Sequence, residues 1–232
     1  MRILAIIVAR KGSKGIPNKN IKLLKDKPLI AYTFQEVKKV ESIDRVVLST
    51  DDHKAIELAH NYNIEVPFVR PEHLSTDTSD TKDVIRHTLE FLLHKDNYNP
   101  DAVLLLQPTS PLRKCKHIHE SIELYKSNTK YKSLVSVVKI KHHFNPEMIM
   151  RRHSEVLFES INNSDESKIT NRNHKPSYYA RNGAAIYLFD KNWFLETNKI
   201  YGEQTIGYEM NSMESLDIDD MEDWILAERL IE

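Results

Sequence analysis

Near its N-terminus the sequence reads Arg2-Ile-Leu-Ala-Ile-Ile-Val-Ala9, followed directly by Arg10-Lys-Gly-Ser-Lys-Gly-Ile-Pro-Asn-Lys-Asn20. The first stretch is continuously apolar and rich in β-branched residues, which is typical of a strand buried on both faces. The second contains four cations, Arg10, Lys11, Lys14 and Lys19, and two of the five glycines in the chain. In doubly wound sheets, ligands bind at the carboxyl ends of the strands. The two stretches therefore predict a buried strand that leads into an anion-binding loop.

The loop does not match the common nucleotide-binding motifs GxxxxGK[ST] and GxGxxG. An exposed, solvated basic loop is therefore the alternative interpretation. The strand-loop-helix context favours the anion site, because backbone N–H groups freed by glycine act together with Arg and Lys to hold phosphates.

The rest of the chain alternates between apolar strand patterns and helical patterns. Strands are predicted at about 44–50, 102–107, 133–140 and 184–189, and helices at about 28–40, 52–61, 80–94, 115–127 and 221–231. Strands that alternate with helices at this spacing imply right-handed βαβ crossovers. The predicted fold class is α/β, a Rossmann-like, doubly wound and mostly parallel sheet.

The pattern breaks over residues 141–175, which are polar and contain only short apolar stretches. Such a region cannot form a core of its own and is expected to pack on a partner. We therefore expect an α/β core formed by residues 1–140 and 176–232, with an inserted subregion between them.

Composition excludes several classes of protein. The 232 residues include 33 Lys and Arg against 34 Asp and Glu, so the net charge of −1 argues against a nucleic-acid binder. The single cysteine, Cys115, excludes an internal disulfide and fits a reducing compartment. The apolar run at residues 3–9 is too short for a membrane span, and no other run is longer. We expect a cytoplasmic protein that associates with neither nucleic acid nor membrane.

Two carboxylates near the C-terminus, Asp217 and Asp219, are separated by one residue. In an extended segment their side chains point the same way, and a pair of carboxylates suits Mg²⁺, which also binds substrate phosphates. The alternative is that Asp219 caps the helix that begins near Met221. None of the eleven histidines has a partner at zinc-site spacing.

Three further polar stretches could contribute to a site: Leu106–Arg113 with Gln107, Arg70-Pro71 together with Asp77–Thr81, and Arg181-Asn182-Gly183. Taken singly, each has a structural explanation. The first is a proline-rich turn, the second contains a helix N-cap, and the third is an Asn-Gly turn.

In this order, the stretches resemble the acylneuraminate cytidylyltransferase family, the CMP-sialic acid synthetases. The resemblance extends from Ile7-Val-Ala-Arg10 to Ser215-Leu-Asp-Ile-Asp219, and includes Ser49-Thr-Asp51 and Leu106-Gln-Pro-Thr-Ser-Pro111. It implies a homodimeric enzyme that joins CMP from CTP to a nonulosonic acid, a step in cell-surface glycan synthesis. Mg²⁺ would be the cofactor, with Mn²⁺ as a substitute, and residues 141–175 would be the dimerisation arm.

The resemblance also implies a role for individual residues. Arg10 and Lys19 match phosphate-binding positions and, with Asp219, are the expected catalytic residues. The nucleotide site would comprise Arg10, Gly12, Ser13, Lys14, Gly15, Lys19, Asn20, Arg70, Ser79 and Thr81. The sugar acid would contact Gln107, Arg172, Arg181 and Asn182, and the metal would bind Asp217 and Asp219.

The sequence departs from the family pattern at three places. Lys11-Gly12 replaces the usual Gly-Gly or Gln-Asn, the arginine before Asn182-Gly183 is shifted by one position, and Glu147 stands where some relatives have lysine. The last two lie in the sugar-facing region, so sialic, legionaminic, pseudaminic and Kdo-type acids, and a sugar-1-phosphate, remain alternative substrates. A catalytically silent nucleotide-binding subunit is the other alternative.

Overall fold

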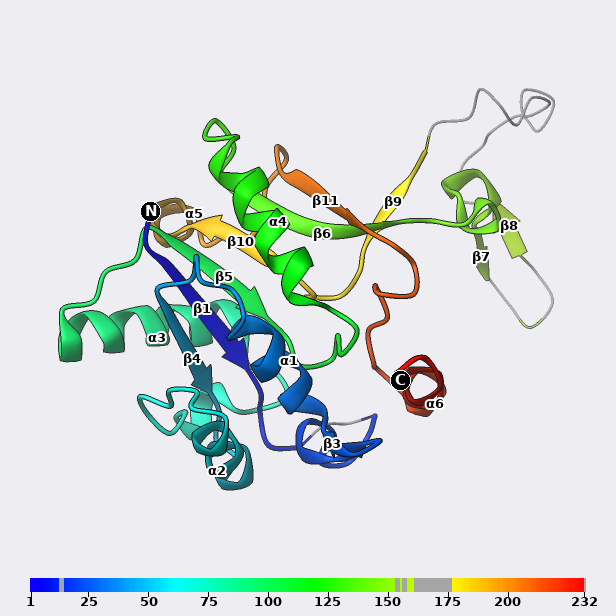
Figure 1. Ribbon diagram of the computed structural model, residues 1–232. Helices are drawn as coiled ribbons and strands as arrows, with labels where there is room; N and C mark the ends of the chain where they lie inside the picture. The colour runs from blue at the N-terminus through cyan, green and yellow to red at the C-terminus, as the bar shows by residue number, and fades with distance from the viewer. Residues whose placement is uncertain (13–14, 153–154, 156–157, 161–176, 232) are drawn as a thin grey trace.

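The computed structural model places a seven-stranded sheet at the centre of the molecule (Figure 1). It describes residues 1–232 except 13–14, 153–154, 156–157, 161–176 and 232. The strand order is β11 (Ile206–Met210), β6 (Ser133–Lys139), β10 (Tyr187–Asp190), β5 (Ala102–Leu106), β1 (Ile3–Val8) and β4 (Arg45–Ser49), and β9 (Tyr179–Arg181) also pairs with β6. Strands β4, β1 and β5 are mutually parallel, β11 is parallel to β6, and β10 is antiparallel to both of its neighbours. The prediction of a mostly parallel α/β sheet is confirmed.

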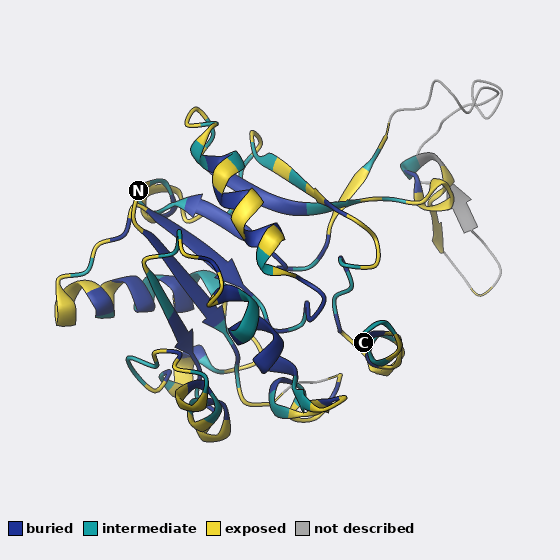
Figure 2. Ribbon diagram, viewed as in Figure 1, coloured by how far each residue is buried: buried dark blue, intermediate teal, exposed yellow. Residues whose placement is uncertain are grey.

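Helices cover both faces of this sheet, as expected for a doubly wound fold. Helices α1 (Leu29–Val37), α2 (His53–Asn61) and α4 (Cys115–Lys126) contribute side chains to one apolar cluster. Helices α3 (Thr81–Asp96) and α5 (Lys191–Thr197) contribute to the cluster on the opposite face. The strands between the helices are mostly buried (Figure 2).

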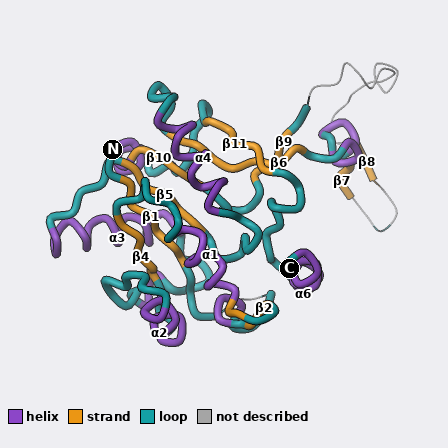
Figure 3. The backbone as a smooth tube through the Cα atoms, in the orientation of Figure 1, coloured by secondary structure: helices purple, strands orange, loops and turns teal. Residues whose placement is uncertain are grey.

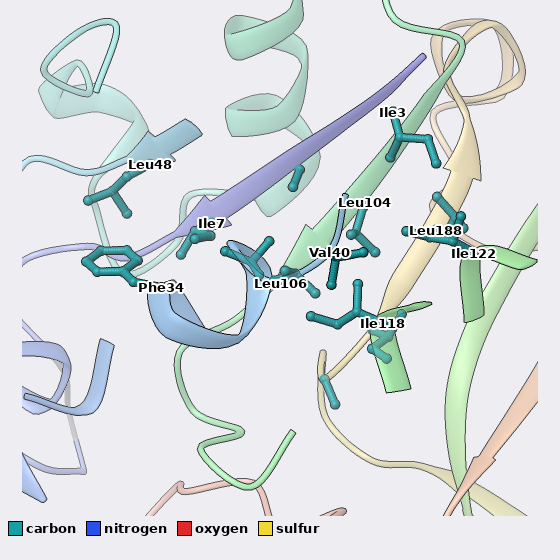
Figure 4. Close-up of a cluster of buried hydrophobic side chains, with 14 of the residues drawn as sticks. Ile3, Ile7, Phe34, Val40, Leu48, Leu104, Leu106, Ile118, Ile122 and Leu188 are labelled. Atoms are coloured by element: carbon teal, nitrogen blue, oxygen red, sulfur yellow. The ribbon is translucent and has the colours of Figure 1, made fainter. Parts of the chain in front are cut away.

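The sequence of β1 explains why this strand is central. Ile3 and Ile7 face the first cluster, whereas Leu4 and Ile6 face the second, and all four are fully buried. Figure 4 shows Ile3 and Ile7 in the first cluster, with Phe34 of α1 and Ile118 of α4. Burial of such a side chain stabilises the fold by about 1.5–3 kcal/mol. A strand that is apolar on both faces therefore contributes most to stability where helices cover both of its faces.

The order of the strands creates a switch point beside β1. The chain passes from β1 to β4 on one side, then crosses to form β5 on the other side. Ligands of doubly wound proteins bind in the crevice at such a point, outside the carboxyl ends of the strands. The loops after β1 and β5 are therefore the ones that can form a site.

A third apolar cluster lies away from the sheet. Helix α6 (Met221–Leu230) packs on the hairpin of β2 (Leu23–Leu24) and β3 (Lys27–Pro28) (Figure 3). Within this cluster Ile16, Ile218 and Trp224 are all almost fully buried. Because Ile16 belongs to the loop after β1 and Ile218 lies between the two aspartates, the cluster holds the cationic loop beside the carboxylate pair.

Residues 141–175, the predicted insert, are described only in part. The described part contains two 3-10 helices, His142–Phe144 and Pro146–Met148, and a separate hairpin of β7 (Met150–Arg152) and β8 (Phe158–Ser160). This hairpin lies beyond the ends of β6 and β9, away from the core (Figure 1).

The helices and strands predicted from sequence are present, with ends that differ mostly by one to three residues. Helix α5, strands β9 and β11, and the short strands of the two hairpins, β2, β3, β7 and β8, were not predicted. In the part of the chain that the structure describes, no helix has both the length and the apolar character needed to cross a membrane.

Candidate functional site

A pocket of about 340 Å³ opens at the carboxyl ends of β1 and β5. Val8 and Ala9 line it from the end of β1, and Gln107, Pro108 and Thr109 line it from the end of β5. The structure brings together nine of the predicted site residues around it: Arg10, Gly15, Lys19, Asn20, Arg70, Ser79, Thr81, Gln107 and Asp219. Ser13, Lys14 and Arg172, which were also predicted, lie outside the described residues.

Gly12 of the cationic loop has a positive φ of 79°, a backbone conformation that favours glycine. The amide nitrogen of Asn20 donates a 3.2 Å hydrogen bond to the carbonyl of Arg10, which closes the loop. The Lys19 ammonium donates a 2.6 Å hydrogen bond to the carbonyl of Ile218. Lys19 therefore ties this loop to the segment that carries the two aspartates.

Arg10 projects into the same pocket and forms an ion pair with Asp77. Asp77 belongs to the loop that precedes α3, so this contact links two walls of the pocket. Both side chains are partly exposed, and an anionic ligand could therefore replace Asp77 at the guanidinium.

Arg70 is a second, more deeply buried cation of the pocket wall. Its guanidinium donates to the hydroxyl of Ser49 at 3.0 Å and to the Ser49 carbonyl. Burial lowers the pKa of Arg70 to about 10, with Asp51 opposing and Arg10 adding to the effect. The side chain stays charged at neutral pH and is fixed at the end of β4.

Ser79 and Thr81 lie on the opposite wall, at the start of α3. The Ser79 hydroxyl donates to the carbonyl of His73 at 3.0 Å and accepts from the amide of Thr76 at 3.0 Å. Asp80 caps α3 through the amide of Lys82. These contacts make the loop before α3 a fixed turn with its hydroxyl groups at the pocket.

The two aspartates have different surroundings. Asp219 lines the pocket, and within the described residues no hydrogen bond or ion pair engages its carboxylate. Asp217 is mostly buried, with the hydroxyl of Ser110 at 3.5 Å. Burial raises the pKa of Asp217 and the nearby Asp219 adds to this, whereas Lys19 acts in the opposite direction.

The alternative that Asp219 caps the C-terminal helix is wrong. Asp220 is the N-cap of α6, and its carboxylate accepts from the amides of Glu222 and Asp223. As the N-cap, Asp220 directs its own side chain to the first amides of α6. The side chain of Asp219, one residue earlier, is therefore not needed for capping and lies at the pocket.

Two glycines fit closely against the aspartate segment. A Cβ on Gly183 would lie 2.3 Å from a carboxylate oxygen of Asp217, and the φ of this glycine is 66°. A Cβ on Gly15 would lie 2.3 Å from the Asp219 carbonyl oxygen. Glycine is therefore needed at both positions for the chain to approach the carboxylate pair.

The four residues expected to contact a sugar acid are not all at this pocket. Gln107 lines it. Asn182 is buried and donates to the Ser215 hydroxyl at 3.0 Å, so it supports the aspartate segment from behind. The guanidinium of Arg181 lies on the exposed β9, 4.3 Å from the ring centre of Tyr201, and Arg181 does not line the pocket.

The sequence placed Asp77 and Arg113 within polar stretches that could contribute to a site, but it assigned neither residue an individual role. Arg113 is 1% exposed and donates to the Gln107 and Ala185 carbonyls and to the Thr33 hydroxyl. Burial lowers its pKa to about 10, while Asp217 and Glu36 counteract this. A buried guanidinium that binds two carbonyls fixes the turn after β5. The position of Arg113, a charged residue at the end of a proline-rich turn, was the feature of the sequence that could have indicated this role.

The carboxylate pair fits a magnesium ion. No cluster of three or more His, Cys, Asp or Glu suited to a metal occurs among the described residues. Mg²⁺ does not need such a cluster, because it is usually held by one or two carboxylates together with substrate phosphates and water. Asp219 at the pocket and the nearby Asp217 are carboxylates that would suit such an ion.

A pocket at the switch point of a doubly wound sheet, lined by a cationic loop and by Asp219, is typical of α/β proteins that bind phosphorylated ligands. The family model described as cytidylyltransferase matches residues 4–232. The chain belongs to this family.

Curated relatives match along nearly the whole chain. An N-acylneuraminate cytidylyltransferase of Escherichia coli is 37% identical over 97% of this chain and 51% of its own length. A CMP-N,N'-diacetyllegionaminic acid synthase of Legionella pneumophila is 37% identical over 100% of this chain and 97% of its own length. This chain thus spans about half of the first relative and nearly all of the second.

Solved structures share the fold. A structure of CMP:2-keto-3-deoxy-manno-octonic acid synthetase complexed with CTP superposes with a TM-score of 0.72. It covers 99% of this chain and 98% of its own, at 13% sequence identity. This likeness confirms the Rossmann-like architecture.

Proposed function

We propose that this protein transfers CMP from CTP to a nonulosonic acid and releases pyrophosphate. The observation that carries the proposal is the single pocket wall formed by the cationic loop and the carboxylate segment, joined by Lys19 and the carbonyl of Ile218. The identity of 37% to two enzymes named for CMP-activated nonulosonic acids supports it.

The nucleotide would lie between the loop after β1 and the start of α3. Arg10, Lys14 and Lys19, with the backbone of Gly12, Ser13 and Gly15, would bind the phosphates of CTP. Asn20, Arg70, Ser79 and Thr81 would recognise cytosine and ribose. The triphosphate would replace Asp77 as the partner of Arg10. The guanidinium would then remain paired with an anion.

The sugar acid would approach from the side of Gln107, which lies at the end of β5. We also propose contacts between the sugar acid and Arg172, Arg181 and Asn182. Of these, Asn182 would act through Ser215, because its amide is buried behind the aspartates.

In the reaction, the anomeric hydroxyl of the sugar acid attacks the α-phosphorus of CTP. The new bond joins the anomeric oxygen to the α-phosphorus, and the bond from the α-phosphorus to the oxygen that it shares with the β-phosphorus breaks. Pyrophosphate leaves with that oxygen, and the hydroxyl proton passes to solvent. The residues of this chain contribute mainly by positioning and by neutralising charge, as in other phosphoryl-type transfers. Mg²⁺, which Asp217 and Asp219 would hold, supplies further charge neutralisation and a lowered pKa for the attacking hydroxyl. Mn²⁺ would substitute for it.

The alternative to this proposal is a catalytically silent subunit that only binds a nucleotide. Measuring pyrophosphate release with different nucleotides distinguishes the two. A site that hydrogen-bonds the amino group of cytosine leaves buried polar groups unpaired when UTP replaces CTP. We expect pyrophosphate release with CTP and a nonulosonic acid, and little release with UTP or ATP. Equal rates with all three nucleotides, or none with any, would contradict the proposal. Sialic, legionaminic, pseudaminic and Kdo-type acids, and a sugar-1-phosphate, form the panel that identifies the acceptor.

Arg10→Ala is expected to lower kcat/KM for CTP roughly ten- to a hundredfold, because a hydrogen bond to a charged group is worth about 1.5–3 kcal/mol. Steady-state kinetics with varied CTP measure this. The matched control is Arg229→Ala, an exposed arginine in the last turn of α6. Unchanged kinetics of Arg10→Ala would mean that the loop is ordinary surface.

We further propose that the protein is a cytoplasmic homodimer that forms through residues 141–175. Large apolar side chains gather in the described part of this insert, where Phe144 is 58% and Met150 55% exposed. An apolar surface of this kind is typical of a protein-protein interface.

Phe144→Asp combined with Met150→Asp is expected to convert the dimer to monomer, since a charge placed in an apolar interface loses its hydration. Sedimentation at micromolar concentration measures the change. Leu93→Asp on the exposed side of α3 is the control and should leave the dimer intact. A wild-type monomer of 27 kDa with full activity would refute the dimer.

A further inference from the structure

The segment that leads into Asp217 forms a compact turn. The side-chain oxygen of Asn211 accepts from the amides of Met213 at 3.0 Å and Glu214 at 2.9 Å. The amide of Ser215 donates to the Asn211 carbonyl at 3.0 Å. This turn presents the Glu214 side chain to the N-terminal end of α4.

His117 of α4 receives that carboxylate. Its imidazole is almost completely buried, and Nδ1 accepts a 3.0 Å hydrogen bond from the backbone amide of Lys114. Nδ1 is therefore unprotonated, so Nε2 carries the hydrogen in the neutral ring. Nε2 lies 3.1 Å from a carboxylate oxygen of Glu214, to which it donates.

Glu214 has two further partners. The Lys116 ammonium lies 3.0 Å from its other carboxylate oxygen, Oε1, and the Asn211 amide nitrogen donates to Oε2, the oxygen that His117 also contacts. Three donors thus hold a carboxylate located three residues before Asp217, and two of them belong to α4. An anchor that combines a buried imidazole and an ammonium is stronger than an ordinary surface ion pair.

The same segment is held again immediately beyond Asp217. The amide of Ile218 donates to the Thr109 carbonyl at 2.8 Å, and the Ile218 carbonyl accepts from Lys19. The course of the chain through Asp217 is therefore defined by the Glu214 anchor on one side and by the Ile218 contacts on the other.

We propose that Glu214, held by His117 and Lys116, is a positioning residue that sets the places of Asp217 and Asp219 at the pocket. It does not line the pocket and acts through the chain. The proposal rests on the proposed function in one respect, which is that the two aspartates hold the metal of the reaction.

The test compares Glu214→Gln with Glu222→Gln. Both remove one negative charge three residues from an aspartate of the pair, but Glu222 is exposed at the start of α6 and is not bound to α4. In the metal-free protein, hydrogen exchange of the backbone amides at 211–219 should accelerate about tenfold in Glu214→Gln, as expected for lost hydrogen bonds to a charged group. Glu222→Gln should exchange like wild type.

A second readout separates positioning from general stability. The Mn²⁺ concentration that half-saturates the protein in the presence of CTP, followed by electron paramagnetic resonance, should rise about tenfold in Glu214→Gln, while CTP binding without metal stays unchanged. Lys116→Met, which alters an exposed side chain, should shift both readouts in the same direction by a smaller factor. The double variant should match Glu214→Gln, because the two residues act through one contact.

Wild-type exchange rates and Mn²⁺ affinity in Glu214→Gln would overturn the inference, as would additive effects of the two substitutions. If Glu214→Gln does not fold, Lys116→Met decides by the same two readouts. Failure of the wild-type protein to form a CMP-sugar would instead refute the proposed function, and the exchange experiment would still decide the role of Glu214 in holding the segment.

Discussion

Asp219→Asn is expected to lower turnover by about two orders of magnitude, because a metal site supplies several kcal/mol of charge stabilisation to a reaction of this kind. Asn keeps the size and the hydrogen-bonding shape of the side chain but removes the negative charge. The pocket exposes this carboxylate, and the helix cap is provided by Asp220, so the fold should survive.

The matched control is Asp220→Asn, one position further along the chain. Asn caps a helix about as well as Asp, so activity and melting temperature should change little. Wild-type activity should disappear with EDTA and return with Mg²⁺ or Mn²⁺. Full activity of Asp219→Asn, or activity that resists EDTA, would show that the carboxylate pair does not hold a metal for the reaction.

Gly183→Ala is expected to reduce both stability and activity strongly. The backbone φ of 66° costs a residue with a Cβ about 1–2 kcal/mol. The added Cβ would also stand 2.3 Å from the Asp217 carboxylate, which must then move. Since Asp217 is short and mostly buried, we expect kcat to fall roughly tenfold or more, beyond the loss explained by stability, as is typical when support of a metal ligand is disturbed.

Gly207→Ala is the control for this substitution. A Cβ at Gly207 would meet the Val137 side chain at 3.5 Å, which is an ordinary contact. Thermal melts and kcat, measured with saturating Mg²⁺, should therefore stay near the wild-type values. If Gly183→Ala were as active as Gly207→Ala, the close packing of Gly183 on Asp217 would have no role in the site.

Much of the core could be predicted because its elements are defined by local pattern. The β-branched run of β1 and the apolar run of β5 are buried on both faces, and a continuous apolar stretch of this kind is visible in the sequence. The same reasoning missed β11. Its residues alternate between exposed positions, one of them Gly207, and positions that are partly buried or, at Met210, buried. Because this alternation is short and lies at the sheet edge, pairing with β6 rather than propensity determines this strand.

The site was predictable in its composition but not in its connections. The cationic loop was placed at the edge of the sheet because it follows a buried strand, and the spacing of Asp217 and Asp219 predicted that their side chains point the same way. That the two aspartates lie near this loop was implied by the family resemblance and not by strand ends. The bonds from Lys19 to Ile218 and from Glu214 to His117 join residues 199 and 97 positions apart. Contacts at such separation depend on the packing of α6 and α4, which local pattern does not encode.

The sequence could not decide whether Asp219 or Asp220 caps α6, because this too depends on how the helix packs. From sequence, Asp219 could either cap a helix or face a ligand. Trp224 and Ala227 of α6 are buried against the hairpin of β2 and β3, and this packing fixes where the helix starts. With this start, Asp220 rather than Asp219 is the N-cap residue.

The identity of the product provides the decisive measurement. The protein is incubated with CTP, Mg²⁺ and each nonulosonic acid of the panel, and the products are examined by ³¹P NMR and mass spectrometry. We expect pyrophosphate together with a CMP-sugar in which one phosphorus joins the cytidine ribose to the anomeric oxygen, with at least one of the acids and with neither UTP nor ATP. Hydrolysis of CTP without a sugar conjugate, or no product with any acid, would contradict the assignment of this pocket to cytidylyl transfer.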